Sequence, residues 1–503
     1  MTPQFPAIDW AGLAPLLFLV GGAIWVLLWD AFSPRRDERL LAAFSLLVLA
    51  LALAAGLAGR PSAPARWGPL AAAPGSGATM GGMYLADPLG LFFNGVILLS
   101  SFLSVLISVA YNPRWDLGRG EYYGLILFAT AGMVLMASSR SLLVIFLGLE
   151  VLSLSLYILA GFLKGRAVSN ESALKYFLLG SFASGFLLYG VALIYGATGS
   201  TDLARIAAGL ARRGAGAGAG ASAARDPVLL LGVGFVLVGF GFKLALVPFH
   251  MWTPDVYEGA PTAVTAFLSV GPKAAAFAGF YRFLVGLGAL RPQWTPVLWA
   301  LAALTMTFGN VVAIAQVNLK RMLAYSTIAH AGYMLIALVV GTPEAVGGLL
   351  YYLLAYTFMN LGAFAVLAAV GSREDEALNL PDYAGLGFRR PALALSLSLF
   401  LLALAGVPPT AGVVGKFYLF GAAVREGYVG LALVGVINTV ISVYYYLRVV
   451  VYMYMREPER EVALPPASAY MVAAVALAVV GVLDLGLFPG TFIELARHSL
   501  ALP

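Results

Sequence analysis

Five charged residues lie inside or at the edge of long apolar runs in this sequence. They are Glu150, Lys175, Lys243, Lys273 and Lys416. A lysine at membrane depth costs at least ~3 kcal/mol on insertion scales, so it is kept for a function more often than for packing. Arginine stays charged at ordinary pH, whereas a desolvated lysine or carboxylate can exchange its proton. These residue types therefore indicate proton exchange within a membrane.

Proline interrupts the apolar runs beside two of these lysines. Pro248 lies five residues after Lys243, and Pro408 and Pro409 precede Lys416. Because proline donates no N–H, a carbonyl one turn earlier loses its usual helical partner. Backbone freed in this way can bond to protein or to water in a cavity. The prolines therefore predict two broken helices with a hydrated lysine beside each.

The remaining candidates each have a structural and a functional interpretation. Glu150 is a proton site or half of a structural ion pair. Lys175 is an interfacial anchor that reaches the surface, or it pairs with Glu150 across adjacent helices. His330, in YSTIAHAGYM, is a relay between two halves of the chain or a hydrogen-bonded core residue, since histidine titrates near neutral pH. His250 is interfacial or functional, and its position favours neither.

The composition is that of a polytopic membrane protein. Of 503 residues, 61% are hydrophobic and 11% are charged, whereas a soluble domain is about half apolar and about a quarter charged. The chain has no cysteine, which excludes iron–sulfur clusters ligated by this chain, disulfides and a thiol nucleophile. Three scattered histidines without cysteine also argue against a transition-metal site. The net charge of +6 fits arginine-rich cytoplasmic loops, and no soluble basic module for nucleic acid is present.

The apolar runs predict about fourteen transmembrane helices, because each is long enough to cross a bilayer. The N-terminus lacks a basic segment and a cleavage site, so the first run is expected to stay as a helix. The predicted spans are 10–30, 40–58, 87–110, 122–138, 141–162, 171–197, 227–249, 261–286, 295–316, 322–340, 345–370, 391–420, 428–453 and 468–490.

The segments between these runs indicate the orientation. Their arginine and lysine content favours both termini on the outer side. Asp255, Glu258 and Asp382 are predicted to be cytoplasmic turn residues with a structural or gating role, and Lys164 and Lys320 are predicted to lie in short polar loops.

The outer loop 199–226 is long and has two parts. Its residues 203–213 could form an amphipathic helix on the membrane surface, and residues 213–224 read as a flexible Gly–Ala linker.

The fourth to thirteenth runs divide into two sets of five, and the fourth run of each set is broken by proline. Such matching interruptions are typical of inverted-repeat transporters, and an odd number of helices makes the repeats antiparallel. The predicted fold is an all-α membrane protein with two inverted five-helix repeats. Its expected parts are helices 1–3 (1–121), a first antiporter-like repeat (122–290), a second repeat (291–454) and a last helix (455–503).

Several segments resemble a known family. GFKLALVPFHMWTPDVYEGAPTAVTAFLSVGPKAAAF is similar to the seventh and eighth helices of the antiporter-like subunits of respiratory complex I, the proton-pumping NADH–quinone oxidoreductase. The segment VPFHMWTPDVYEGAP resembles the sequence of subunit N more than those of subunits L and M. Further matches are FLGLEVLSLSLYILAGF, ESALKYFLLGSFASGFLLYG, NLKRMLAYSTIAHAGYM and GVPPTAGVVGKFYLF, which together cover roughly 141–420.

The resemblance implies roles for particular residues. In the family, a glutamate on helix five, lysines on helices six, seven and eight, and a lysine or glutamate on helix twelve carry proton translocation, and a histidine often lies on helix ten. Those positions fall on Glu150, Lys175, Lys243, Lys273, Lys416 and His330. The implied mechanism joins two half-channels, with Glu150 and Lys175 as a modulating pair and Lys416 at the exit.

The resemblance also implies an assembly and a location. The chain itself would bind no cofactor, while FMN, iron–sulfur clusters and quinone would lie in or near partner subunits. The expected partners are K and M as neighbours, A, J, L and H, and the peripheral redox arm, in a bacterial inner membrane. Two alternatives share the fold: a subunit of a multisubunit sodium/proton antiporter, and a subunit of a hydrogenase-linked or other dehydrogenase complex. A structural scaffold without conduction would leave the membrane lysines unexplained.

Overall fold

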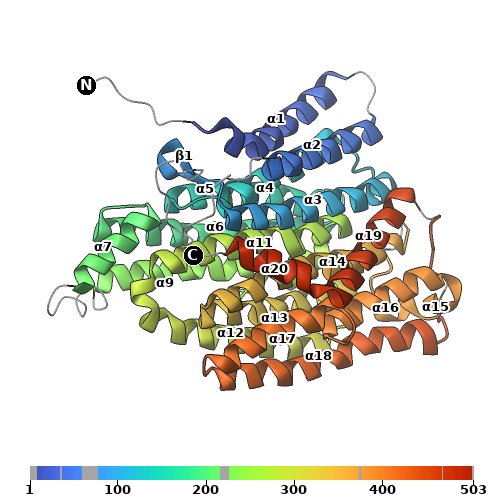
Figure 1. Ribbon diagram of the computed structural model, residues 1–503. Coiled ribbons are helices and arrows are strands. Elements are labelled where there is room, and N and C mark those ends of the chain that lie inside the picture. Colours follow the sequence, from blue (N-terminus) through green and yellow to red (C-terminus); the bar gives the residue numbers. More distant parts are fainter. Residues whose placement is uncertain are drawn as a thin grey trace.

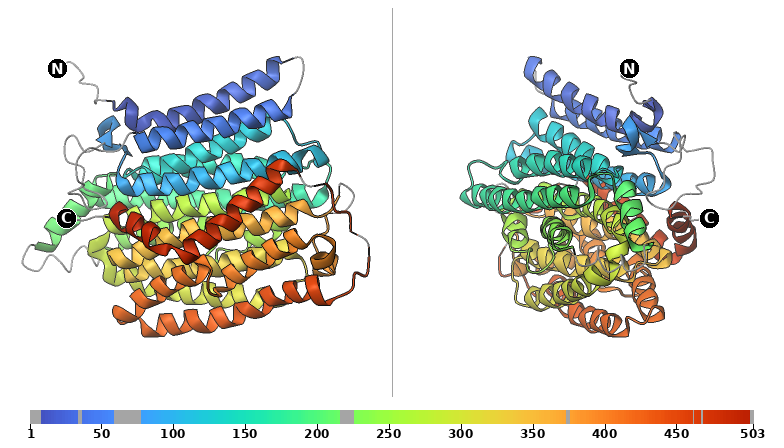
Figure 2. Two further views of the ribbon diagram at one scale, coloured as in Figure 1. Left: turned by 45° about the vertical axis from the view of Figure 1, so that its right-hand side comes forward. Right: turned by 90° about the vertical axis from the view of Figure 1, so that its left-hand side faces the viewer.

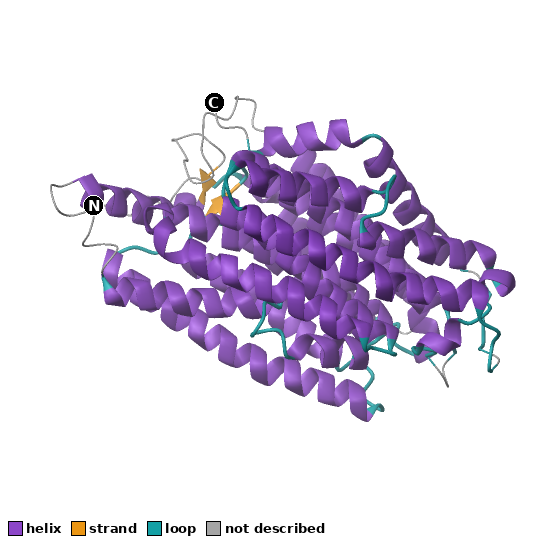
Figure 3. Cartoon of the chain, turned by 90° about the horizontal axis from the view of Figure 1, so that it is seen from below, coloured by secondary structure: helices purple, strands orange, loops and turns teal. Residues whose placement is uncertain are grey.

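The structure is a computed structural model, and it describes residues 8–33, 37–58, 78–215, 226–372, 376–460, 462–466 and 468–500. Within these ranges the chain is almost entirely helical, as predicted, and thirteen helices are long and apolar enough to cross a membrane. The one small sheet is a hairpin of two-residue strands in a segment predicted to be loop, visible at one end of the molecule in Figure 3.

The elements follow the predicted runs closely. In chain order they are α1 (Trp10–Phe32), α2 (Glu38–Ala58), β1 (Ala78–Thr79), η1 (Met80–Gly82), β2 (Tyr84–Leu85), α3 (Pro88–Trp115), α4 (Gly120–Ala137), α5 (Leu142–Ala160), α6 (Ala167–Thr198), α7 (Leu203–Ala215), α9 (Pro227–Leu244), α10 (Trp252–Gly259), α11 (Thr262–Gly286), η2 (Gly288–Leu290), α12 (Arg291–Ile314), α13 (Leu319–Val340), α14 (Pro343–Ala369), η3 (Leu380–Tyr383), α15 (Leu386–Arg389), α16 (Pro391–Ala405), α17 (Ala411–Arg425), α18 (Val429–Met455), α19 (Ala469–Leu487) and α20 (Pro489–Ser499).

The long helices lie side by side in one bundle, with α1 and α2 along one edge and α18 along the opposite edge (Figure 1). The start of α1 and the end of α20 lie toward the same end of the bundle (Figure 2). α19 and α20 cross its face obliquely and contact α3 and α14.

Three helices form the interior of the bundle. In their most apolar 18-residue windows, 100% of the residues of α11, 94% of α13 and 89% of α14 are buried, against 33–39% for α1, α2 and α6. Polar side chains on α11, α13 and α14 therefore face protein rather than lipid. This burial explains how a membrane segment can carry lysine, histidine and several tyrosines, since each can bond to a neighbouring helix.

Both predicted interruptions occur, and the two helix ends close in the same way. α9 ends at Leu244, and Ala245 takes a left-handed conformation with φ of +58°. Its successor Leu246 donates its N–H to the carbonyl of Gly241 at 2.8 Å. This is the 6→1 bond of a Schellman ending, which satisfies a carbonyl that the helix leaves free. Pro248 follows in the non-helical segment before α10.

The second break repeats this pattern. α16 ends at Ala405, and Gly406 has φ of +86°. Val407 donates its N–H to the carbonyl of Leu402 at 3.0 Å, and the chain passes through Pro408 and Pro409 before α17 begins. The predicted twelfth run is thus two helices of 15 residues each. The seventh run likewise ends as a helix five residues earlier than its apolar content predicts.

Some loop predictions need correction. Asp255 and Glu258 lie in helix α10 rather than in a turn, and Asp382 lies in the short helix η3. Lys320 is fully buried in the first turn of α13 rather than in a polar loop. The helix predicted over residues 203–213 is α7, while most of the Gly–Ala linker lies outside the described residues.

Candidate functional site

Lys243 occupies the last turn of α9, immediately before the first break. Its side chain is buried, and its Nζ donates to Ser153 Oγ at 2.8 Å and to Tyr176 OH at 3.4 Å. The ammonium also lies 5.4 Å from the centre of the Tyr176 ring. A cavity of about 10 Å³ borders Lys243 and Ser153, which is about the room one water needs.

Glu150 lies on the face of α5 that also presents Ser153, one turn later. Its Oε1 is buried and has no hydrogen-bond partner among the described residues. The predicted pair with Lys175 is not formed. Lys175 Nζ lies instead 2.6 Å from Asp255 Oδ2 and 2.7 Å from Glu171 Oε1. The reason is geometric: Lys175 lies two turns into α6, within reach of α10.

Lys273 lies in the middle of α11 and is buried among inner helices. Its Nζ donates to the carbonyl oxygen of Thr327 on α13 and lies 6.0 Å from the centre of the Tyr356 ring on α14. Tyr356 OH in turn donates to Thr327 Oγ1 at 2.9 Å. Lys273 is therefore joined to α13 and α14 through neutral partners.

His330 lies on α13, one turn after Thr327, and both of its ring nitrogens are bonded. Nδ1 is 2.7 Å from Tyr352 OH and Nε2 is 3.2 Å from Tyr446 OH. Tyr446 OH also bonds to Ser326 Oγ. A histidine held between two hydroxyl groups can accept a proton on one nitrogen and release it from the other, which is the geometry a relay requires.

Lys416 lies on α17 and reaches back across the second break to the end of α16. Its Nζ donates to the carbonyls of Leu404 at 3.0 Å and Ala405 at 2.9 Å, which are carbonyls that the end of a helix leaves free. The ammonium lies 4.9 Å from the centre of the Tyr333 ring. A cation at a helix C-terminus is favoured by the helix dipole.

The three buried lysines beside or between the two breaks share one property. Lys243, Lys273 and Lys416 are each buried, and within the described residues their bonds go to hydroxyl or carbonyl oxygens and not to carboxylates. Arg282 and Lys175 differ, since Arg282 is bonded to Asp87 and Lys175 to Asp255. An amine without a carboxylate partner can release its proton without breaking an ion pair.

His250 lies between α9 and α10, beside the first break. Its Nδ1 is buried without a hydrogen-bond partner in the described part of the chain, and its ring meets Phe308 edge-on at 4.7 Å. This contact places His250 against α12.

The buried carboxylate of Glu376 is absent from the sequence-based candidates. It accepts from Tyr111 OH at 2.6 Å and from Arg166 at 2.6 Å. Burial alone would raise the pKa of Glu376, but the nearby Lys320 ammonium and the bonds from Tyr111 and Arg166 hold that pKa below its usual value. Lys320 Nζ donates to the carbonyl of Ala260 at 2.7 Å. The available sequence signal was an acidic residue in one polar connector, Glu376, together with basic residues in two others, Arg166 and Lys320.

The tyrosines around His330 are a second set that sequence reasoning missed. Tyr352, Tyr356 and Tyr446 are fully buried and supply hydroxyl groups to the interior. Their signal was the repeated tyrosine within apolar runs, at YYLLAY and YYY. Nothing in a single run, however, indicates that helices α14 and α18 turn these faces toward α13.

The chain is similar to known proteins along its length. The family model "NADH:quinone oxidoreductase/Mrp antiporter, TM" matches residues 139–442. NADH-quinone oxidoreductase subunit N of Trichlorobacter lovleyi is 46% identical over 499 residues, covering 99% of this chain and 98% of the relative. NADH-quinone oxidoreductase subunit N 1 of Herpetosiphon aurantiacus is 46% identical over 98% of this chain and 97% of the relative.

Solved structures agree with these matches. A chain of respiratory complex I from Thermus thermophilus with bound aureothin superposes with a TM-score of 0.78 at 38% identity, covering 96% of this chain and 99% of that chain. A chain of the Mrp complex from Dietzia sp. DQ12-45-1b gives a TM-score of 0.79 at 23% identity over 97% of both chains, which shows a shared fold.

Proposed function

The chain belongs to the family of NADH-quinone oxidoreductase subunit N, and from this premise we propose that it translocates protons as a membrane subunit of that oxidoreductase. It is a non-redox subunit of the complex. Electron transfer from NADH to quinone takes place in partner subunits, which carry the FMN and the iron–sulfur clusters. This chain then moves protons across the membrane when quinone chemistry in partner subunits changes the electrostatics or the positions of its helices.

One observation carries this proposal: the buried lysines Lys243, Lys273 and Lys416 bond to neutral oxygens, with His330 held between two tyrosine hydroxyls. A buried amine with a structural role usually has a carboxylate as partner or close by, as the buried Lys320 has Glu376, because an uncompensated buried charge is costly. Amines with neutral partners can alternate between charged and uncharged forms.

The proposed path starts at Glu150 and runs inward. Glu150 acts electrostatically on Lys243, which exchanges a proton with Lys273 through bonded hydroxyls and water. His330 passes the proton toward Lys416, where the exit lies. The prolines Pro248, Pro408 and Pro409 keep both breaks non-helical, so that backbone carbonyls and water remain available there.

Lys175 is bonded to Asp255 and Glu171 in the structure, and not to Glu150, the partner that the resemblance implies. We propose that release of Lys175 from Asp255 allows it to approach Glu150. The pair would then modulate the proton on Lys243, and Glu150 would compete with Asp255 and Glu171 for one ammonium.

The test is proton pumping by the assembled complex in sealed membrane vesicles. Lys243→Ala and Glu150→Ala are expected to lower the number of protons moved per electron, because each removes a charge from the path. Arg205→Ala on α7 and Glu457→Ala after α18 are matched controls, since both side chains are exposed. Unchanged ratios in both path variants would refute the proposal.

The partners are proposed from the same premise. The chain is expected in the membrane arm of the complex with subunits K and M as neighbours, alongside A, J, L and H and the peripheral redox arm. A sodium/proton antiporter is the second candidate, because the Mrp complex of Dietzia shares the fold. Co-purification decides between them: flavin and iron–sulfur subunits support the oxidoreductase, and their absence supports the antiporter.

The topology is proposed likewise. The chain crosses the bacterial inner membrane many times, with both termini on the outer side. Residues 122–290 and 291–454 would form two inverted repeats, between the first three helices (1–121) and the last (455–503). In support, α9 and α16, the helices before the two breaks, end through the same hydrogen-bond pattern.

A further inference from the structure

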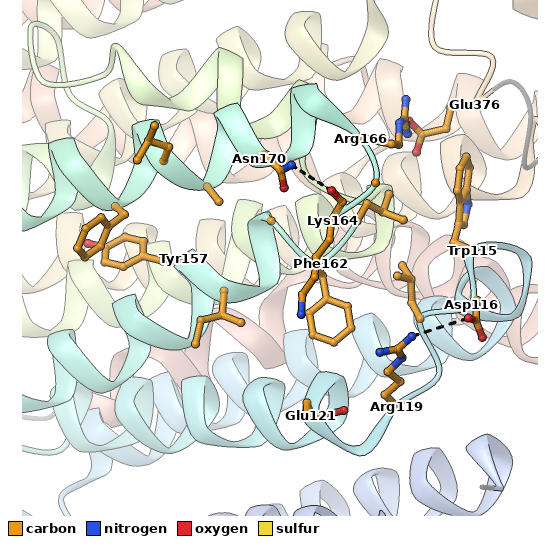
Figure 4. A pocket seen from close by; sticks show the side chains of 18 residues that line it. Trp115, Asp116, Arg119, Glu121, Tyr157, Phe162, Lys164, Arg166, Asn170 and Glu376 are labelled. Carbon is orange, nitrogen blue, oxygen red and sulfur yellow. Dashed lines mark hydrogen bonds and ion pairs between the residues drawn. The ribbon is translucent and has the colours of Figure 1, made fainter.

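A cavity of about 1080 Å³ opens at the end of the bundle where α3 and α5 end and α4 and α6 begin (Figure 4). It is far larger than the cavity of about 10 Å³ beside Lys243, and the proposed proton path does not use it. Most of its lining comes from the turn between α3 and α4, from the loop between α5 and α6, and from one face of α6.

One wall of the cavity is apolar and belongs to membrane helices. Ile158 on α5 is 55% exposed, and Leu174 and Phe177 on α6 are 58% and 45% exposed. Leu174 and Phe177 are three residues apart, so they lie on one face of α6 with Ala173. Such a surface at the depth of the bilayer suits a hydrocarbon chain.

The rim of the cavity is polar and comes from the connecting turns. Lys164 points toward the side of the cavity where Arg119 and Glu121 lie, as Figure 4 shows. The backbone of this loop is fixed, because Asn170 Nδ2 donates to the carbonyl of Lys164 at 3.0 Å. Arg166 lies over the Trp115 ring at 5.4 Å.

The rim carries equal numbers of opposite charges. Its cations are Arg119, Lys164 and Arg166, and its carboxylates are Asp116, Glu121 and Glu376. Arg166 is committed to Glu376 at 2.6 Å, while Arg119 approaches Asp116 only to 3.8 Å. Lys164 and Glu121 have no side-chain bond to any other described residue. Among the residues that the structure describes, the rim therefore offers an ammonium and a carboxylate that are not engaged with each other or with a neighbour.

We propose that this cavity binds a phospholipid whose zwitterionic headgroup ends in a primary ammonium, as in phosphatidylethanolamine. The phosphate would bind Lys164 and Arg119, the ammonium would bind Glu121, and an acyl chain would lie along Ile158, Leu174 and Phe177. Phosphatidylglycerol has the same phosphate but offers Glu121 only neutral hydroxyl groups, so it lacks the positive charge that would compensate the carboxylate. A choline headgroup has no N–H to donate to the carboxylate.

The lipid would have a structural consequence for the loop it occupies. That loop joins α5, which carries Glu150, to α6, which carries Lys175, and Arg166 ties it to Glu376. A headgroup bonded to both Lys164 and the α3–α4 turn would hold these helix ends at a fixed separation. This inference stands without the proposed proton path, because it depends only on the rim and the apolar wall.

The test uses a photoreactive phosphatidylethanolamine in membranes that contain the chain within its assembled complex. Labelled peptides are expected from the α5–α6 loop and the first turns of α6. Unlabelled phosphatidylethanolamine should compete several-fold better than phosphatidylglycerol or phosphatidylcholine. Soluble glycerophosphoethanolamine at the same concentration should compete little, because it lacks the acyl chain.

Variants localise the effect. Lys164→Ala and Glu121→Gln should each lower labelling of this site several-fold, whereas Arg39→Ala, an exposed cation on α2, should not. Equal competition by the three lipids in the unaltered chain would overturn the proposal without any variant. So would full competition by the soluble headgroup, or labelling that appears only when the chain is separated from its complex, which would mean that another subunit fills the cavity.

Discussion

Gly406 lies where the end of α16 and the side chain of Lys416 meet. Its φ is +86°, and a Cβ there would be 3.1 Å from Lys416 Cδ and 3.3 Å from Nζ. Gly406→Ala is therefore expected to add roughly 1–2 kcal/mol of backbone strain and to displace the amine as well. Proton pumping per electron should fall in vesicles.

The control for this substitution is Gly427→Ala. Gly427 has φ of +81°, but a Cβ there meets nothing within 4 Å. Both variants carry similar backbone strain, so only the first should change pumping. Equal effects would mean that strain, and not the position of Lys416, is responsible.

His330 gives a second prediction at the residue scale. His330→Gln keeps an amide that can bond to Tyr352 and Tyr446 but cannot carry a proton at neutral pH. If His330 relays protons, pumping per electron falls while the complex still assembles. A variant that pumps normally would identify His330 as a hydrogen-bonded core residue.

The buried lysines could be found from the sequence because a charge within an apolar run is visible in the run itself. Their partners could not. Lys175 and Asp255 are 80 residues apart, and Lys243 and Ser153 are 90 apart. Such contacts depend on which helices become neighbours, so the expected Lys175–Glu150 pair was replaced by one that only the packing of α10 against α6 creates.

At the scale of elements, Glu376 fastens the connector between α14 and η3. It lies against Arg166 and Tyr111, while Leu380 N and Val317 O are bonded at 2.9 Å nearby. Glu376→Gln should loosen this connector, because it removes the negative charge that acts most strongly on the buried Lys320. Loss of one partner of a buried charge pair costs roughly 3 kcal/mol or more. Hydrogen exchange of residues 376–384 should rise.

The same junction has a predictable pH dependence. The pKa of Glu376 is lower in the folded chain than its usual value of about 4.3. Its bonds therefore stabilise the fold fully above that usual value and are lost as the pH falls through the lower, folded-state pKa. Exchange of residues 376–384, corrected for intrinsic rates, should be flat near neutral pH and rise in acid. In Glu376→Gln the acid-dependent rise should be absent, and its persistence would assign the effect to another group.

Helix positions were largely predictable, because twenty apolar residues in a row have few alternatives in a bilayer. The proline breaks were predictable too, since proline removes a donor. The end of α9 was not, because the apolar run continues past Ala245, whose left-handed conformation no apolar count reveals. Helix α10 was missed for a related reason: eight residues with two acids read as a turn until they pack against α6 and α13.

For the whole molecule, the proposed topology can be tested directly, because the chain has no cysteine of its own. Glu426 and Glu457 are exposed at opposite ends of α18, whose 27 residues span about 40 Å. In intact cells an impermeant maleimide should label Glu426→Cys, and it should label Glu457→Cys only after the membrane is opened. The reverse pattern would invert the topology.

The bond between Lys416 and the end of α16 has a consequence beyond the passage of protons in one direction. Protonation of the Lys416 amine is coupled to the position of the carbonyls of Leu404 and Ala405, to which the amine is bonded. Any shift of the helix end that changes how tightly the amine holds its proton must be matched by an equal effect of that proton on the shift, because coupling free energies are reciprocal. A proton gradient imposed across the membrane would then shift the end of α16. The same contact would therefore also operate when the pump runs in reverse.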